Sequence, residues 1–551
     1  MSYLDVPRLH FFGAFTADPS TINNDPANYD PSNWSNLDLA WNPHGSHAWS
    51  IQGEIQSFID QDGQCHDASS NDKLVGATIH NITPLTVPAK LVDLDTDAQT
   101  RTRLYGLNLE IALPGSSDSF LLQGSFLETA ALLNLWFARV PSTQGDPAAS
   151  AAWQSVLQDL KWGDLSASPL LQQLQQVSPA SLSIRLSVYA FDASRSSPTF
   201  KQGKIVGAIG PRAADEPRHL VAGRFLSPPA NSKLWDAPAK VDESHKRLTL
   251  DLGNSIPEQS AAGPPLDFGD MRAAILTSSG PVVLGKIDYS QAQYQLTAGV
   301  VQIDDLTAEQ IKQLSDNPLG ILVSKGGGTH VGEDTLIALQ ENADGIHIQA
   351  DGATLILNPG DKAAVDLYVT EYGRPKAGYQ VPLQLVNVGI NSDPATGNDP
   401  ASGISFPAET APTDANGRTQ IPLLANDPIP IPDRRRFIGG QLYYIGGAWM
   451  SHADQFLGGP LIVKVFNARQ EIPNPTWKDV QPILVQYYTL YPYMAGKVDL
   501  SSYGAVKTSK EAIKFDLSLS VSDPRYMPVS RDLSRDEQAL ILRWIESGAP
   551  A

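Results

Sequence analysis

Two short groups of residues in this sequence carry side chains that bind transition metals. His44 and His47 lie three residues apart, and Cys65, His66 and Asp67 are consecutive. Adjacent residues on a strand point to opposite faces, so the consecutive group has poor chelating geometry. A complete zinc site also needs three or four protein ligands. The pattern favours loop histidines that bond the backbone, and the sequence predicts no metal site.

Three alternating aspartates, Asp93, Asp95 and Asp97, are similar to the start of a calcium-binding loop. A loop of the EF-hand type needs a glycine at its sixth position and a bidentate acid at its twelfth. Ala98 and Leu104 occupy those two positions. Surface ion pairs with the nearby arginines are therefore the favoured interpretation.

Tyrosines are dense near the C-terminus, at Tyr487, Tyr488, Tyr491 and Tyr493. On a helix, Tyr487 and Tyr491 share one face. Large aromatic side chains dominate protein cores, so an aromatic core is the simplest interpretation. The alternative that the sequence leaves open is a flat pocket for an aromatic ligand or a noncovalent porphyrin.

The overall charge and the cysteine content restrict the partners of the chain. Its 551 residues carry a formal net charge of −19, which disfavours binding to nucleic acid or to anionic membranes. No apolar run approaches the roughly 18 residues of a membrane-spanning helix. Cys65 is the single cysteine, so no intramolecular disulfide can form. With no signal-peptide pattern after Met1, we expect a cytoplasmic protein.

The elements that must position these residues are mostly strands, because short apolar runs alternate with glycine and proline turn signals. Residues 1–335 are expected to form a large β-rich N-terminal region, with room for two subdomains. Residues 345–470 are expected to form an immunoglobulin-like β-sandwich, and residues 475–551 a helical domain. We therefore predict a mainly β fold with a helical C-terminal domain.

Helices are predicted where apolar residues recur at spacings of three and four, or where capping residues mark a start. Asp146 is a candidate N-cap for the first of them. Thr307 with Gln310, and Ser534 with Glu537, form candidate capping boxes. The predicted helices span Pro147–Leu160, Pro169–Val177, Thr307–Leu314, Trp477–Leu490 and Ser534–Ser547.

The C-terminal region resembles a class I cytochrome c domain in outline. In such domains Cys-x-x-Cys-His follows the first helix, but here Tyr488 and Tyr491 replace the cysteines and Pro492 replaces the histidine. Covalent haem attachment needs the thiols, and axial ligation needs the imidazole. A c-type haem is thus excluded, and Met527 alone cannot hold one. A cytochrome c-like helical fold kept for packing is the favoured interpretation.

Motifs towards both ends carry a second resemblance. Residues 4–13 have the sequence LDVPRLHFFG, and further motifs follow at residues 91–106, 203–207, 222–224 and 526–534. In these motifs the chain resembles the N-terminal half of the imine dimer synthases of violacein and indolocarbazole biosynthesis, such as chromopyrrolate synthase. The match covers residues 1–260 and 475–546 and is vaguer in the predicted sandwich.

This resemblance implies a stand-alone relative of enzymes that couple two imino acids derived from tryptophan or a similar aromatic amino acid. The full-length synthases continue into a ferritin-like domain with iron-binding carboxylates, which this sequence lacks. We therefore expect an oxidoreductase or cofactor-binding protein of aromatic amino-acid-derived secondary metabolism. Noncovalent haem stays open, since family members are haem proteins. The candidate catalytic residues are His10, His47, Tyr491 and Arg531, and the candidate cofactor-binding residues are Trp49, Arg224 and Met527.

The competing hypothesis is a non-catalytic structural or ligand-binding protein, for example a carbohydrate-binding one, that lacks the catalytic half. The missing haem-attachment residues and the missing ferritin-like domain favour it. Under either hypothesis an aromatic small molecule, a second copy of the chain or a partner protein is a candidate partner, and nucleic acid and membrane are not.

Overall fold

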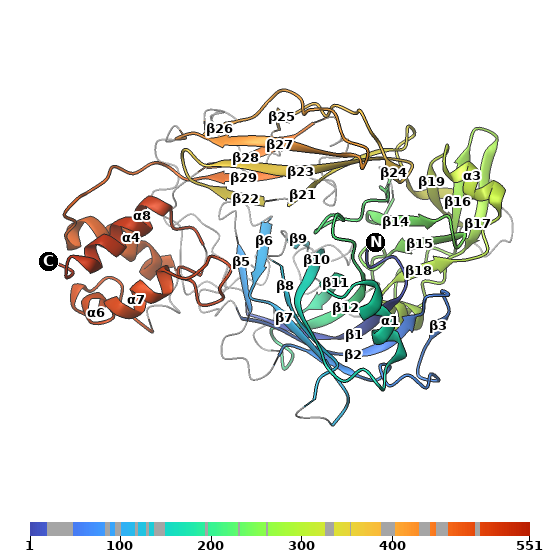
Figure 1. The fold of residues 1–551 in the computed structure, drawn as a ribbon, viewed down its shortest axis with the longest axis horizontal. Coiled ribbons are helices and arrows are strands. Elements are labelled where there is room, and N and C mark those ends of the chain that lie inside the picture. The colour runs from blue at the N-terminus through green and yellow to red at the C-terminus, as the bar shows by residue number, and fades with distance from the viewer. Residues whose placement is uncertain are drawn as a thin grey trace.

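The computed structural model describes most of the chain, and strands dominate it (Figure 1). Among the described residues, no helix combines the length and the apolar composition that crossing a membrane requires. The described residues are all except 19–47, 83–88, 94–100, 116–118, 128–131, 137–148, 193–196, 230–231, 260–262, 325–334, 353, 387–402, 429–440, 448–460, 491–495 and 530.

The N-terminal strands close into an eight-stranded barrel. Its order is β1-β12-β11-β10-β8-β7-β4-β2, and β2 pairs again with β1 to close the ring. These strands are β1 (Arg8–Ala17), β2 (Ala48–Ile59), β4 (Thr78–His80), β7 (Asn108–Ala112), β8 (Leu122–Phe126), β10 (Ala149–Trp162), β11 (Leu182–Phe191) and β12 (Gln202–Pro211).

Two long strands, β2 and β10, each change partners along their length. Near its start β2 pairs with β5 (Ala89–Asp93), whereas its middle pairs with β4 and its end with β3 (Cys65–His66). Near its start β10 pairs with β9 (Leu132–Trp136). Strand β9 pairs in turn with β6 (Arg101–Tyr105), and β6 pairs with β5. The ring is therefore closed by different strands at its two ends.

The barrel interior is filled by side chains. In β11, Ile184, Leu186 and Val188 face a core of buried apolar residues. The predicted helix is confirmed as α1 (Pro169–Val177), capped by Ser168. Its buried leucines join the same core, so α1 closes the barrel at the end where β10 finishes.

The helix predicted over Pro147–Leu160 is wrong, because Ala149–Trp162 form the strand β10. The strand is buried on both faces from Ala151 to Leu157, so it lacks the apolar–polar alternation of a half-buried strand. Pairing with β11 on one side and β8 on the other decides its conformation. The predicted cap, Asp146, lies outside the described residues.

A middle unit follows the barrel and has its own core between two four-stranded sheets. One sheet has the order β13-β14-β15-β18 and the other β17-β16-β19-β20. The capping box predicted at Thr307 and Gln310 is confirmed at the start of α3. The elements are β13 (Arg224–Leu226), β14 (Ala237–Asp242), β15 (Arg247–Asp251), β16 (Asp270–Thr277), β17 (Gly280–Lys286), α2 (Gln291–Thr297), β18 (Val300–Ile303), α3 (Ala308–Leu314), β19 (Leu319–Ser324) and β20 (Thr335–Gln340).

Two further sheets enclose a third core and form a β-sandwich beside the barrel (Figure 1). The first sheet has the order β21-β23-β27-β26, with β24 paired to β23, and the second β22-β29-β28-β25. The strands are β21 (Ile346–Asp351), β22 (Thr354–Leu357), β23 (Lys362–Glu371), β24 (Arg374–Pro375), β25 (Gln384–Leu385), β26 (Ile404–Ser405), β27 (Arg418–Ala425), β28 (Gln441–Gly446) and β29 (Leu461–Val465).

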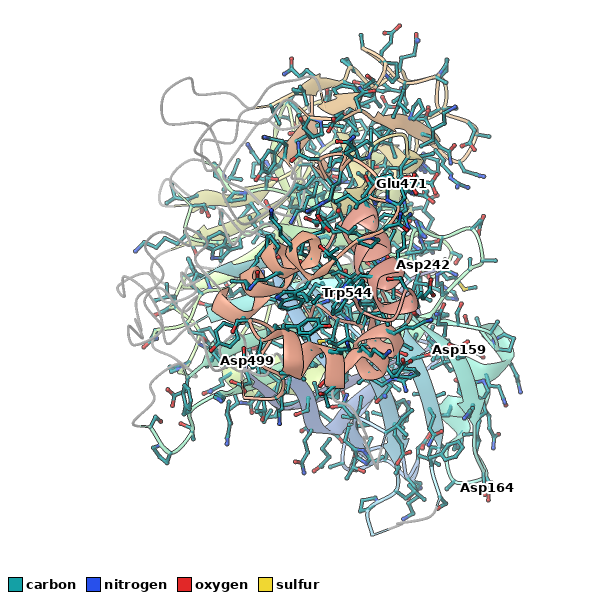
Figure 2. All side chains as sticks on the ribbon, turned by 90° about the vertical axis from the view of Figure 1, so that its left-hand side faces the viewer. Asp159, Asp164, Asp242, Glu471, Asp499 and Trp544 are labelled. Atoms are coloured by element: carbon teal, nitrogen blue, oxygen red, sulfur yellow. The ribbon has the colours of Figure 1, made fainter. Side chains whose placement is uncertain are left out.

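The last described elements are the helices α4 (Trp477–Leu490), α6 (Tyr503–Thr508), α7 (Lys510–Leu517) and α8 (Arg535–Glu546). The capping box predicted at Ser534 and Glu537 is present at the start of α8. Trp544 lies fully buried in the middle of this helical region (Figure 2). Its indole N–H donates to the carbonyl of Pro550 at 2.8 Å, and its ring lies 5.6 Å from that of Trp477.

A buried ion pair joins the barrel to the middle unit. Arg185 on the outer face of β11 donates two hydrogen bonds to Asp251 at the end of β15, and both side chains are at most 6% exposed. The Tyr3 hydroxyl donates to the same carboxylate at 2.6 Å, and the backbone N–H of Gly253 donates at 2.9 Å. Each carboxylate oxygen of Asp251 therefore accepts two hydrogen bonds. A buried charge is stable only when it is paired and hydrogen-bonded in this way.

A second charged contact joins the sandwich to the segment after the barrel. The Asp351 carboxylate accepts hydrogen bonds from the backbone N–H groups of Arg218 and His219 and from both side chains, at 3.0–3.2 Å. Burial alone would raise the pKa of Asp351, but the hydrogen bond from His219 and the contacts with Arg218 outweigh it and lower the pKa to about 2.

The Asp251→Ala variant should test the first contact, because it leaves the Arg185 guanidinium buried without a counter-charge. We expect it to lower the free energy of unfolding by about 3–5 kcal/mol, measured by urea titration with tryptophan fluorescence. Glu243→Ala is the matched control. Glu243 pairs with Arg374 where both side chains are about half exposed, so its loss should cost less than about 1 kcal/mol. Equal losses in the two variants would contradict this role for Asp251.

The second contact should make the protein sensitive to acid. The folded pKa of Asp351 lies below its ordinary value of 3.8, so its stabilising effect is complete above pH 4 and is lost as the pH falls towards 2. The difference corresponds to about 2 kcal/mol. We expect Asp351→Asn to show a shallower loss of stability over this range, measured as unfolding midpoints from pH 5 to pH 2. Parallel curves for the two proteins would be the contrary result.

Candidate functional site

Four aromatic side chains gather inside one end of the barrel. Phe15 lies near the end of β1, Trp49 near the start of β2, Trp153 near the start of β10 and Phe191 at the end of β11. Phe15 stacks between Trp49 and Phe191, with ring centroids 5.8 Å apart in both pairs. Trp153 meets Trp49 edge-on at 5.9 Å. We call these four residues the aromatic cluster.

Strand register explains why these residues meet. Ala17 on β1 faces Trp49 on β2, and Trp153 on β10 faces Leu186 on β11. Side chains two residues apart on a strand point to the same face, which places Phe15, Trp49 and Trp153 on the inner face. Phe191 reaches the same core because the register of β10 and β11 shifts there and Ala190 has a positive φ of 52°. Since α1 closes the opposite end, the aromatic cluster occupies the end where β1 finishes and β2 begins.

The aromatic cluster contains one buried polar atom that no described residue bonds. The Trp153 side chain is 3% exposed, and its indole N–H has no hydrogen-bond partner among the described residues. Buried tryptophan N–H groups usually find a partner, and leaving one unpaired costs about 1–3 kcal/mol. An acceptor brought by a bound molecule would remove that cost. The arrangement thus combines apolar aromatic surface with one hydrogen-bond donor.

His10, a candidate catalytic residue, is fully buried on the outer face of β1. Its Nε2 accepts a hydrogen bond from Arg8 at 3.3 Å. Its Nδ1 lies 3.0 Å from the Ser57 hydroxyl, which itself donates to the carbonyl of Leu296. The ring is therefore neutral with the proton on Nδ1. Burial, with the charges of Arg8 and Arg185, holds the pKa of His10 well below its ordinary value, and both ring nitrogens are already bonded.

Arg224, a candidate cofactor-binding residue, forms a buried ion pair inside the middle unit. Its guanidinium donates to the Glu341 carboxylate and to the carbonyl of Leu314. Burial raises the pKa of Glu341 to about 7, although Arg224 acts against it. The sandwich turn at Gly373 packs on this arginine, where a Cβ atom would lie 2.6 Å from the Arg224 Cγ. Arg224 therefore positions the sandwich on the middle unit.

Arg531 and Met527, two further candidates, lie in the loop before α8. The Arg531 guanidinium donates to three backbone carbonyls of this helical region, at 2.6–3.2 Å. It also covers the ring of Tyr105 at the end of β6, 4.4 Å from the centroid, a cation–π contact. Met527 is half-buried in the same loop. The contact between Arg531 and Tyr105 connects the helical region to strand β6.

The structure thus places the candidate residues at separate locations. Trp49 lies in the barrel interior, His10 on the barrel's outer face, Arg224 in the middle unit, and Arg531 with Met527 in the helical region. His47 and Tyr491, the other two candidates, lie outside the described residues. Within the described ranges, no group of three or more histidine, cysteine or acidic side chains could hold a metal ion.

Sequence analysis did not nominate Phe15, Trp153 or Phe191. Phe15 lies two residues after the motif at residues 4–13. The alternation of buried side chains along β1 would have identified it as a residue that faces the barrel interior. Trp153 was missed because its segment was assigned to a helix. The unpaired N–H has no signature in the sequence, since it depends on what surrounds the ring.

Comparisons with known proteins do not identify the chain. No family model and no curated protein matches it. Among solved structures it is similar to the ectodomain of the teleost fish polymeric Ig receptor, at 12% identity over 41% of this chain and 92% of that one, with a TM-score of 0.15. Two structures of the S-layer protein SbsC match at 9% identity over 77% of this chain, with TM-scores of 0.15, and the chain spans 53% of each. Such TM-scores carry no argument about function, and the relation to the imine dimer synthases stays a prediction.

The structural role of His10 has a measurable consequence. Because its folded pKa lies well below its ordinary value of 6.5, unfolded His10 takes up a proton below pH 6.5 and folded His10 does not. Its contribution to stability is therefore lost as the pH falls, by about 1.4 kcal/mol at pH 5.5. We expect His10→Gln, whose amide can bond both Arg8 and Ser57, to lose this pH dependence between pH 7.5 and 5.5 in urea titrations. His245→Gln, at an exposed turn, is the control. An unchanged pH dependence in His10→Gln would refute the assignment.

Proposed function

We propose that this chain is a non-catalytic binding protein that holds an aromatic small molecule carrying a hydrogen-bond acceptor at the end of the barrel where the aromatic cluster lies. The observation that carries the proposal is the buried indole N–H of Trp153, which has no partner within the described part of the chain and lies among three other aromatic rings. The proposal retains the aromatic partner and the role of Trp49 that the sequence suggested.

The chemistry of the aromatic cluster selects the class of ligand. Offset and edge-on aromatic contacts each contribute about 0.5–1.5 kcal/mol beyond the burial of apolar area. A carbonyl or carboxylate oxygen on the same molecule would pair with the Trp153 N–H, and a bond to a charged acceptor adds about 1.5–3 kcal/mol. Aromatic acids and their derivatives satisfy both requirements. The mouths of β-barrels are also common ligand sites.

The contacts of the other candidate residues support binding rather than catalysis. His10 and Arg531 use their polar atoms on the protein itself, and the guanidinium of Arg224 donates to Glu341 and to the carbonyl of Leu314. A residue that must take up protons or hold a substrate carboxylate needs those atoms available. We also propose that the sandwich is immunoglobulin-like, that the helical region has a cytochrome c-like fold, and that the protein is cytoplasmic.

An oxidoreductase acting on aromatic amino or imino acids is the second candidate function. The same aromatic cluster favours it, because the substrates that the family resemblance implies are aromatic acids. The two candidates differ in turnover: binding alone leaves an aromatic imino acid unchanged, and catalysis consumes it. Noncovalent haem belongs to this second candidate, and an absorption spectrum of the purified protein tests it.

Removing the indole N–H while keeping an aromatic ring should weaken binding selectively. We expect Trp153→Phe to bind indole-3-acetate about tenfold more weakly than the unmodified protein does, since tenfold corresponds to about 1.4 kcal/mol and one hydrogen bond. Binding of 3-methylindole, which lacks the carboxylate, should change less than about threefold. Isothermal titration calorimetry of both ligands with both proteins gives the comparison.

Trp162→Phe is the matched control for this experiment. Trp162 ends the same strand, β10, but its indole N–H already donates to the carbonyl of Pro179 at 3.1 Å. Its replacement should leave the binding of both ligands unchanged. The proposal fails if neither ligand binds the unmodified protein, or if Trp153→Phe weakens both ligands equally.

A further inference from the structure

The aromatic cluster is closed to solvent. None of its four residues is more than 7% exposed, so a ligand reaches their rings only after part of the surrounding wall moves. The cluster lies at the barrel end where β1 and β11 finish and β2, β10 and β12 begin, and α1 closes the opposite end. The question of how a ligand is admitted at this rim rests on the proposed function, because it concerns the same site.

A turn just before β12 forms part of this rim. It consists of residues 197–201, and we call it the rim turn. The carbonyl of Lys201 accepts a hydrogen bond from the N–H of Ala17 at 2.9 Å, and the Lys201 N–H donates to the carbonyl of Asp192 at 2.8 Å. The Thr199 hydroxyl also donates to the Asp192 carboxylate, at 2.6 Å. The rim turn therefore connects the end of β1 to the end of β11.

An ion pair adds a charged contact to the rim turn. The Lys201 ammonium lies 2.6 Å from the carboxylate of Asp18, the residue that follows β1, and the two side chains are 30% and 15% exposed. Because both side chains reach solvent, water and salt ions compete for them, and such a pair contributes little free energy. This contact can thus break and re-form without unfolding the barrel.

The backbone of Lys201 holds an unfavourable conformation. Its φ is 70°, which lies in the left-handed region that side chains other than asparagine, aspartate and histidine seldom adopt. The contacts to Ala17, Asp18 and Asp192 must outweigh this cost while the rim is closed. Losing one of them therefore opens the rim turn more easily than it would open an unstrained turn.

Movement of the rim turn reaches the aromatic cluster through β12. Gly203 lies two residues after Lys201 and pairs with Phe15. A Cβ atom on Gly203 would overlap the Phe15 ring, so this ring rests directly on the backbone of β12. We propose that the rim turn is a gate that admits ligands to the aromatic cluster, and that the ion pair between Lys201 and Asp18 is the latch that keeps it closed.

Asparagine variants remove the latch and keep the turn, since asparagine tolerates a positive φ. We expect Lys201→Asn and Asp18→Asn each to raise the association and the dissociation rate constants of indole-3-acetate about threefold, the size of effect that a partly exposed ion pair produces. The dissociation constant should stay nearly unchanged, because the latch closes over the free and the occupied site alike. Stopped-flow tryptophan fluorescence gives both rates. The double variant should match the single ones, because all three lose the same contact.

Hydrogen exchange reports on the gate without a ligand. The Ala17 amide bonds across the rim to Lys201, and neither substitution changes a side chain next to it on its N-terminal side. We expect this amide to exchange about threefold faster in both variants. Lys376→Asn is the matched control, because Lys376 forms an ion pair of similar exposure with Glu371 in the sandwich. It should leave the Ala17 exchange rate and both ligand rate constants unchanged.

The possible failures of the gate and of the proposed function are distinguishable. Indole-3-acetate that binds with the same rate constants in both variants as in the unmodified protein would overturn the gate alone. An unchanged Ala17 exchange rate, or a double variant whose effect is the product of the single effects, would overturn the latch role of the ion pair. If indole-3-acetate binds none of the proteins, the proposed function fails and the gate fails with it.

Discussion

The buried ion pair between Arg185 and Asp251 is the constraint on which the arrangement of the units depends. Arg185 projects from the outer face of a barrel strand, so the barrel alone cannot satisfy it. A charge removed from water must be paired and fully hydrogen-bonded, or the fold loses several kcal/mol. The middle unit supplies the carboxylate, and Tyr3 at the N-terminus completes its shell. The outer face of the barrel is therefore an interface, and its polar residues have fixed partners.

The motif that carries the family resemblance serves this same interface. Arg8 donates to Leu4, to His10 and to Gln302 of the middle unit, and His10 leads through Ser57 to the carbonyl of Leu296. Residues of the motif are thus held by contacts between units. These residues therefore serve the packing of one unit on another.

The inside and the outside of the barrel have opposite chemistry. Apolar side chains fill the interior, and among the described residues no acceptor reaches the indole N–H of Trp153 there. The outer face carries buried polar and charged side chains such as Arg8, His10 and Arg185, which bond to one another and to the middle unit.

The sequence by itself determined the features that depend on neighbouring residues. The capping boxes at Thr307 and Ser534 and the helix over Pro169–Val177 follow from side chains three residues apart or from local spacing, and the charge of −19 from composition. Tertiary structure decided the rest. β10 is a strand because strands far away in the sequence pair with both of its edges. Trp153 became a candidate only because no described residue accepts a hydrogen bond from its buried indole N–H, a property of the packed surroundings that no local pattern of residues encodes.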